Sequence, residues 1–228
     1  MVQILGMVTP KLSTVVVTIS YFGLWYKLSN ESEEWRRCFY YQFWDMEPES
    51  DTFDPRNISK IALYSPGVSI DYLMQGFDVD ISRNDSNGWQ SLLGGPIEFL
   101  LTDESSENRM LAHNEFIHRN HLNDNLSYID RLLTELQSRD VRVVLVTVPV
   151  YGRYLKHADP QILSENHRII AGIASRYSVS YHDYSRDTRF GYQDFYDPDH
   201  LNQTGAQKFS RLLDAEVLVT QFDDHGDR

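Results

Sequence analysis

An aspartate and a histidine near the carboxyl end of the chain form the combination best suited to chemistry. Asp197 and His200 are three residues apart on a segment that contains Pro198 and precedes an amphipathic stretch. A neutral imidazole can take a proton from a hydroxyl group and return it to a leaving group. It works best when a carboxylate holds one ring nitrogen, because this fixes the tautomer and stabilises the imidazolium. We therefore expect His200 to be a general base and Asp197 the acid that orients it.

The same segment also has a purely structural interpretation. Asp197 or Asp199 could cap the helix that follows, with His200 as an ordinary surface residue, and the pair alone does not separate the two readings. Asp199 is adjacent to the histidine, so we expect its side chain to point elsewhere. We expect Asn202 to cap the last helix rather than to bind a substrate.

Other polar side chains are weaker candidates. Tyr151, Arg153 and Tyr154 follow an apolar segment and could line a substrate cleft, although ordinary residues at the rim of a sheet would show the same pattern. We name Tyr151 and Tyr154 as candidate substrate-binding residues. Ser20 and Ser65 each end a possible strand, so either could be an alternative nucleophile, but serines are common in turns.

The sequence offers little support for a metal site. His113, His118 and His121 lack the i, i+4 spacing and the intervening glutamate of a zinc-protease helix. Asp197 and Asp199 resemble the opening of a calcium loop, but the glycine and glutamate that such a loop needs further on are missing. We expect no metal ion and no other cofactor.

Length and composition indicate one domain. The chain has 228 residues, and we expect residues 1–220 to form a single α/β domain and residues 221–228 a disordered tail. With 21 Lys and Arg against 33 Asp and Glu, the net charge is -12, which argues against nucleic acid as a partner. The single cysteine, Cys38, excludes an internal disulfide and a cysteine-based zinc site.

The amino-terminal region predicts neither a membrane span nor a signal peptide. Pro10 and Lys11 interrupt its apolar residues, and the apolar run from Thr14 to Tyr26 is too short to cross a bilayer as a helix. Because the chain opens inside a helix and runs directly into a strand, we expect it to be incomplete at this end. The compartment (the cytoplasm is slightly favoured) and the oligomeric state stay open.

Apolar periodicity predicts alternating strands and helices. We expect strands at 14–20, 141–150 and 178–183. We expect helices at 31–43, from Asn125 (as N-cap) through Leu136, from Pro160 to Ala174, and around Ala206 to Leu213. A helix near residues 2–5, a strand at 58–64 and a helix at 69–76 are weaker predictions. In an open parallel sheet, functional groups gather at the carboxyl ends of the strands. The loops at 20–22, 149–152 and 197–200 should then share one rim.

The block from Asp194 to Ser210, with its Asp-x-x-His-Leu-Asn-x-x-Gly-Ala pattern, resembles the carboxyl-terminal block of bacterial SGNH/GDSL hydrolases. Val144–Tyr151 with the later Asn166, and Ile19–Tyr26, also resemble segments of that superfamily. The resemblance covers most of the chain, but only the last block is specific. It implies a three-layer α/β/α sandwich with a mainly parallel, flavodoxin-like sheet, of which the amino-terminal strands are missing here. It also implies a Ser-His-Asp triad with His200 as base and Asp197 as acid.

The serine of such a triad has no counterpart here. No Gly-Asp-Ser occurs, Gly67-Val68-Ser69 lies in the wrong place, and the family's Gly-x-Asn-Asp block is replaced by Ser20–Gly23. Either an upstream segment holds the serine, in which case this chain alone is inactive, or the chain is a degenerate relative. The first reading makes the protein an esterase or acyltransferase acting on a small-molecule or carbohydrate ester, such as an O-acyl glycan. The alternative is a non-catalytic binding or scaffolding relative.

Overall fold

The computed structural model describes residues 12–28, 35–43 and 98–218, together with the single residues 55, 62, 70 and 74. In this part of the chain, three parallel strands form one sheet in the order β1 (Thr14–Thr18), β2 (Arg142–Thr147) and β3 (Ser180–Asp183). Val16 lies opposite Val144, and Val146 lies opposite His182. The inner residues of the central strand β2 are buried, which explains why its sequence is an almost unbroken apolar run.

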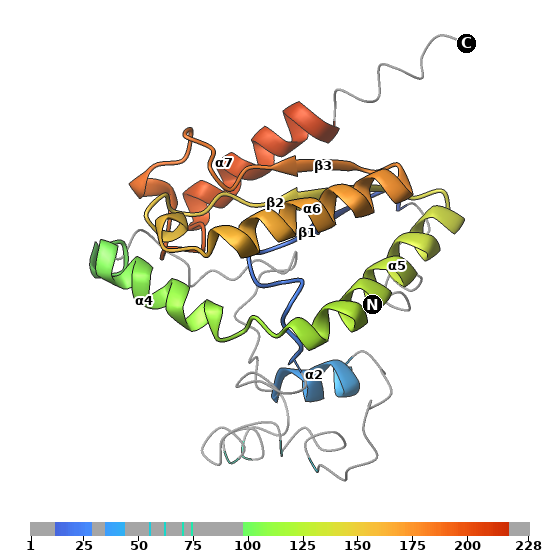
Figure 1. The fold of residues 1–228 in the computed structure, drawn as a ribbon, viewed down its shortest axis with the longest axis horizontal. Coiled ribbons are helices and arrows are strands. Elements are labelled where there is room, and N and C mark those ends of the chain that lie inside the picture. The colour runs from blue at the N-terminus through green and yellow to red at the C-terminus, as the bar shows by residue number, and fades with distance from the viewer. Residues whose placement is uncertain are drawn as a thin grey trace.

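The helices lie between and after the strands (Figure 1). Their bounds are α2 (Trp35–Phe43), α4 (Asp103–Asn114), α5 (Leu122–Ser138), α6 (Pro160–Tyr177) and α7 (Gln203–Leu213). Short 3-10 turns cover Glu98–Leu100, Arg119–His121, Tyr154–Lys156 and Tyr192–Asp194, and a π-helical turn, Asp214–Leu218, follows α7. The chain is thus mixed α/β with a parallel sheet, as its sequence predicts. None of the described helices is long and apolar enough to span a membrane.

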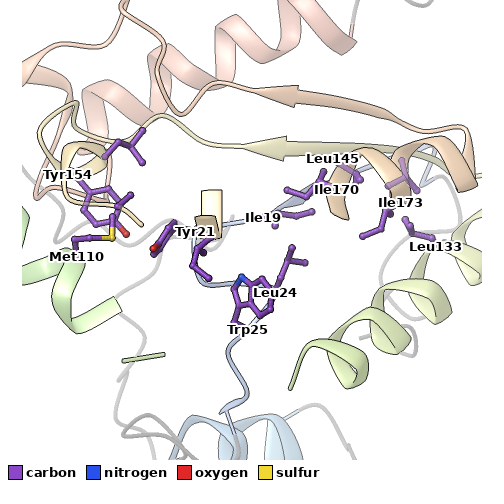
Figure 2. Packing of buried hydrophobic residues seen from close by; sticks show 14 of the residues in the cluster. Ile19, Tyr21, Leu24, Trp25, Met110, Leu133, Leu145, Tyr154, Ile170 and Ile173 are labelled. Carbon is purple, nitrogen blue, oxygen red and sulfur yellow. The ribbon is translucent and has the colours of Figure 1, made fainter. Parts of the chain in front are cut away.

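Side chains along β2 alternate between two cores, because successive residues of a strand point to opposite faces of the sheet. Val143 and Leu145 pack in a first core that includes residues of α5 and α6, as Figure 2 shows for Leu145, Leu133 and Ile170. Val144 and Val146 face a second core that contains Phe209 of α7 and its neighbours. All four valine and leucine side chains of this stretch are at most 4% exposed, so each contributes about 1.5–3 kcal/mol of burial.

Local signals set the ends of the helices beside the site. At α6, the side chain of Asp159 accepts a hydrogen bond from Gln161 N, and Pro160 occupies the first turn as its fixed φ favours. The helix ends at Tyr177, and its C-cap, Ser178, has a left-handed φ of 51°. At α7, the side chain of Asn202 accepts from Gly205 N, so the predicted cap is confirmed.

The structure corrects several predictions. Strands β1 and β2 end at Thr18 and Thr147 rather than at residues 20 and 150, and α4 lies where the sequence predicted no helix. Helix α5 begins at Leu122, so Asn125 lies inside it and does not cap it. The Asn125 amide instead donates to the carbonyl oxygens of Leu24 and Tyr26, which ties α5 to the segment after β1. The predictions for residues 2–5, 65, 67–69 (the Gly-x-Ser segment) and 221–228 lie outside the described residues, and so do most of the strand predicted at 58–64 and most of the helix predicted at 69–76. Ala62, the one described residue of the predicted strand, has 3-10 geometry instead.

Candidate active site

The loops after the three strands meet at one rim of the sheet, as the sequence predicts. Tyr151 N, after β2, donates to the carbonyl oxygen of Pro198 at 2.9 Å. Ser20, Tyr21 and Phe22, after β1, line the same pocket as His200. Segments far apart in the chain therefore converge where parallel strands end.

His200 and Asp197 form a close pair. His200 Nδ1 lies 2.9 Å from Asp197 Oδ1 and 3.0 Å from Oδ2. Asp197 Oδ1 also accepts the backbone N–H groups of Asp199 at 3.1 Å and His200 at 2.8 Å. The loop itself therefore fixes the carboxylate, and the carboxylate fixes the imidazole.

The charges of this pair support each other. The hydrogen bond that His200 donates to the Asp197 carboxylate raises the pKa of His200, although partial burial opposes the charge on the ring. Burial disfavours the charge on Asp197, but the hydrogen bond and positive charge of His200 outweigh it and lower the pKa of the carboxyl group. An imidazole held in this way can accept a proton, because the ionised carboxylate stabilises the resulting positive charge.

A small hairpin holds the loop in place. Tyr196 N donates to His200 O at 2.9 Å, and Phe195 and Leu201 form an antiparallel bridge. The buried Asn202 amide donates to the carbonyl oxygens of Gln193 at 2.7 Å and Phe195 at 3.2 Å. Asn202 therefore closes the loop as well as capping α7.

Asp199 meets a residue that the sequence did not suggest. Arg109, in the middle of α4, donates from Nε to Asp199 Oδ1 at 2.7 Å and from a terminal nitrogen to Oδ2 at 3.3 Å. Helix α4 starts at a capping box, in which Thr102 and Ser105 bond each other's backbone N–H groups, and this start fixes where Arg109 falls along the helix. The expectation that Asp199 points away from the Asp197–His200 pair holds only in part, since its Oδ1 is 3.6 Å from His200 Nδ1.

His113, also on α4, is a second histidine of the site. It is 3% exposed, and its Nδ1 is 2.6 Å from the hydroxyl of Tyr154. Burial lowers the pKa of His113 to about 4, and the charge of Arg109 acts in the same direction. His113 is therefore a neutral, hydrogen-bonded residue at neutral pH.

A pocket of about 250 Å³ opens beside the pair. Its apolar wall comes from strand ends, a loop and α6, and consists of Ile19, Val148, Val150, Leu155, Leu163 and Ile170. Its polar lining includes Ser20, Asp199 and His200. The pocket thus places an apolar hollow directly next to the candidate base.

Asn166, on the pocket wall, joins α6 to the segment after β1. It is 5% exposed, accepts a hydrogen bond from Trp25 Nε1 at 2.8 Å and donates to Tyr21 O at 2.7 Å. It therefore fastens the loop after β1 to α6. Figure 2 shows Trp25 and Tyr21 on this loop, with Tyr154 nearer to α4.

The two tyrosines named from the sequence separate in the structure. Tyr154 lines the pocket, but its hydroxyl is engaged by His113, and burial raises its pKa. The Tyr151 ring packs on Phe195 with 5.6 Å between ring centroids, and Tyr151 is not among the residues that line the pocket. Arg153 is exposed. Ser20 is exposed and lines the pocket together with His200.

A second histidine–carboxylate pair lines the pocket and was missed from the sequence. His167 Nε2 of α6 lies 2.9 Å from Asp183 Oδ2 at the end of β3. Asp183 accepts one backbone N–H, from Ser185, and its side chain is 26% exposed, against 14% for Asp197. The two residues are 16 apart in sequence, so no local motif could reveal the pair. The Asp197–His200 pair is the better fixed of the two.

Asp197, Asp199 and His200 offer three atoms of metal-ligating type within 4.8 Å of one another. However, the guanidinium of Arg109 already binds Asp199, and its positive charge opposes a cation at this position. We assign no metal to this cluster. Comparisons with models of protein families, with curated proteins and with solved structures give no match to this chain.

Proposed function

We propose that this chain carries the general base and its orienting acid in an ester hydrolase or acyltransferase of the Ser-His-Asp type. The observation that supports the proposal most is the fixed Asp197–His200 pair, with 2.9 Å and 3.0 Å between Nδ1 and the carboxylate oxygens, beside an apolar pocket. The resemblance of residues 194–210 to SGNH/GDSL hydrolases points to the same chemistry. We propose the matching fold, a three-layer sandwich with a flavodoxin-like sheet, on the same grounds.

In the proposed reaction, His200 takes the proton of a hydroxyl nucleophile as its oxygen attacks the ester carbonyl. The tetrahedral intermediate collapses when the imidazolium returns this proton to the departing alcohol. Water, or a second alcohol in the case of transfer, then attacks the acyl group with the same help from His200. Asp197 stabilises the imidazolium in both steps.

The pocket supports a substrate with a short apolar acyl group. Its volume of about 250 Å³ lies below the range of roughly 300–1,000 Å³ that holds drug-sized ligands. Aliphatic side chains on its wall would remove an acyl chain from water and leave the carbonyl near the polar mouth. We propose short-chain esters, including O-acyl groups on a carbohydrate, as the substrate class.

The test is hydrolysis of p-nitrophenyl acetate and butyrate by the protein expressed from its complete natural reading frame. We expect His200→Ala and Asp197→Asn each to lower kcat/KM by about 10²–10⁴-fold. His167→Ala is the matched control, because it removes the other histidine of the pocket, and it should retain most of the activity. If His167→Ala loses activity and His200→Ala keeps it, the proposal has the wrong pair, and His167 and Asp183 are the base and its acid.

The nucleophile is tested in the same assay. Among the described residues, Ser20 is a hydroxyl on the pocket wall after a strand, so Ser20→Ala asks whether it attacks the ester. Activity that survives Ser20→Ala but not His200→Ala assigns the nucleophile to another residue and leaves the base in place. Complete lack of turnover with retained binding of an ester analogue would overturn the hydrolase proposal in favour of a non-catalytic binding relative.

A further inference from the structure

Arg109 reaches from helix α4 to the loop that carries the candidate base. It meets the Asp199 carboxylate through two nitrogens, at 2.7 Å and 3.3 Å, in the paired arrangement that guanidinium and carboxylate groups favour. The Asp199 side chain is only 13% exposed, so water does little to screen its charge. The positive charge of Arg109 therefore changes the net charge of the loop that carries His200.

Asp199 is a potential rival of Asp197 for the same ring nitrogen. His200 Nδ1 is 2.9 Å from Asp197 Oδ1 but 3.6 Å from Asp199 Oδ1, which is beyond hydrogen-bonding distance. The Asp199 oxygen nearest to His200 is the one that accepts the shorter bond from Arg109. Arg109 thus engages the Asp199 oxygen that would otherwise compete with Asp197 for His200 Nδ1.

We propose that Arg109 is a positioning residue that holds the Asp199 carboxylate away from His200 and offsets its charge, so that Asp197 alone orients the base. The inference rests on the proposed function only in taking His200 as that base. The local sequence of the loop could not reveal this interaction, because Arg109 precedes Asp199 by 90 residues.

Titratable and charged groups surround His200 from several elements. They are Asp197 and Asp199 on its own loop, Arg109 and His113 on α4, Tyr154 after β2, and His167 and Asp183 across the pocket. Both carboxylates of the loop raise the pKa of His200, and Arg109 lowers it. Burial lowers the pKa of His113 to about 4, so this residue adds no charge near neutral pH. Arg109 and Asp199 therefore act on His200 in opposite directions.

The test is an NMR titration of the histidine ring resonances in the complete protein. Arg109→Gln should raise the pKa of His200 by about half a unit or more, because Asp199 then keeps its full negative charge and can approach Nδ1. Asp199→Asn should lower it by a similar amount, since the charge of Arg109 stays. Arg109→Lys, which keeps the charge, should restore most of the wild-type value.

Arg176→Gln is the control, because Arg176 pairs with Asp130 at 3.4 Å on the surface and should leave the His200 titration unchanged. An unchanged or lowered pKa in folded Arg109→Gln would overturn the inference. If that variant does not fold, an unchanged or raised pKa in Asp199→Asn overturns it instead. The titration needs no turnover, so its failure can be told apart from failure of the proposed reaction.

Discussion

Two histidines within one site have their pKa values shifted in opposite directions. His200 is half exposed and held by a carboxylate, so its charged form is favoured. His113 is buried against a tyrosine hydroxyl, so its neutral form is favoured. The carboxylate thus favours the protonated form of His200, while His113 stays a neutral hydrogen-bonding group at neutral pH.

The burial of His113 predicts a loss of stability in acid. Its pKa falls from 6.5 in the unfolded chain to about 4 in the folded one, so the unfolded state binds more protons between these values. Stability therefore decreases as pH falls from 6.5 to 4, and His113 contributes up to about 3 kcal/mol of this loss. We expect His113→Asn, which keeps a polar atom near the Nδ1 position, to show a flatter pH dependence.

Urea unfolding of wild type and His113→Asn at a series of pH values between 4 and 7 measures this effect. The difference in free energy of unfolding between the two proteins should shrink, or turn in favour of the variant, toward pH 4. Parallel curves across the whole range would show that His113 is not buried as a neutral ring.

At the scale of elements, helix α7 must pack closely against the hairpin that carries the site. A methyl group at Gly205 would lie 2.0 Å from the backbone oxygen of Asp194, a contact that no side-chain rearrangement relieves. The glycine of the Asp-x-x-His-Leu-Asn-x-x-Gly-Ala pattern thus serves close approach of backbone to backbone. Asn202 and Gly205 together set the start of α7 relative to His200.

We expect Gly205→Ala to destabilise the protein by about 3 kcal/mol or more, because the backbone of α7 or of the hairpin must shift. Gly172→Ala is the matched control in an exposed position of α6, where an added methyl meets no atom within 4 Å. It should stabilise the protein by about 0.5–1 kcal/mol through higher helix propensity. Thermal and urea unfolding measure both, and equal stabilities of the two variants would contradict the close packing of α7.

At the scale of the whole molecule, the net charge of -12 disfavours binding of any polyanion. Arg109 and Arg189, for example, are each paired with carboxylates. We expect no binding to single-stranded DNA or RNA tighter than about 100 μM at roughly 150 mM salt. Fluorescence anisotropy of a labelled oligonucleotide tests this, and saturable binding that weakens with salt would contradict it.

Local patterns were sufficient to predict much of the fold. The β-branched runs, Pro160 at the start of α6 and the cap at Asn202 act over a few residues, so the three strands and helices α2, α5, α6 and α7 could be predicted to within a few residues. Helix α4 was missed, because its residues Asp103–Asn114 include few apolar side chains. Asn125 shows where this fails. Its side-chain amide does not cap a helix but donates to two carbonyl oxygens of the segment after β1. These oxygens come within reach only after α5 has packed against that segment.

The sequence by itself determined the alternation of strands and helices and the Asp197–His200 pair, because both depend on neighbours along the chain. Only the tertiary structure decided that Arg109 and His113 join this pair, that His167 meets Asp183, and that Tyr154 rather than Tyr151 lines the pocket. These contacts join residues from 16 to 90 positions apart. They depend on how α4 packs against the turn at Tyr154–Lys156 and α6 against β3, which is a property of the assembled molecule and not of any local motif.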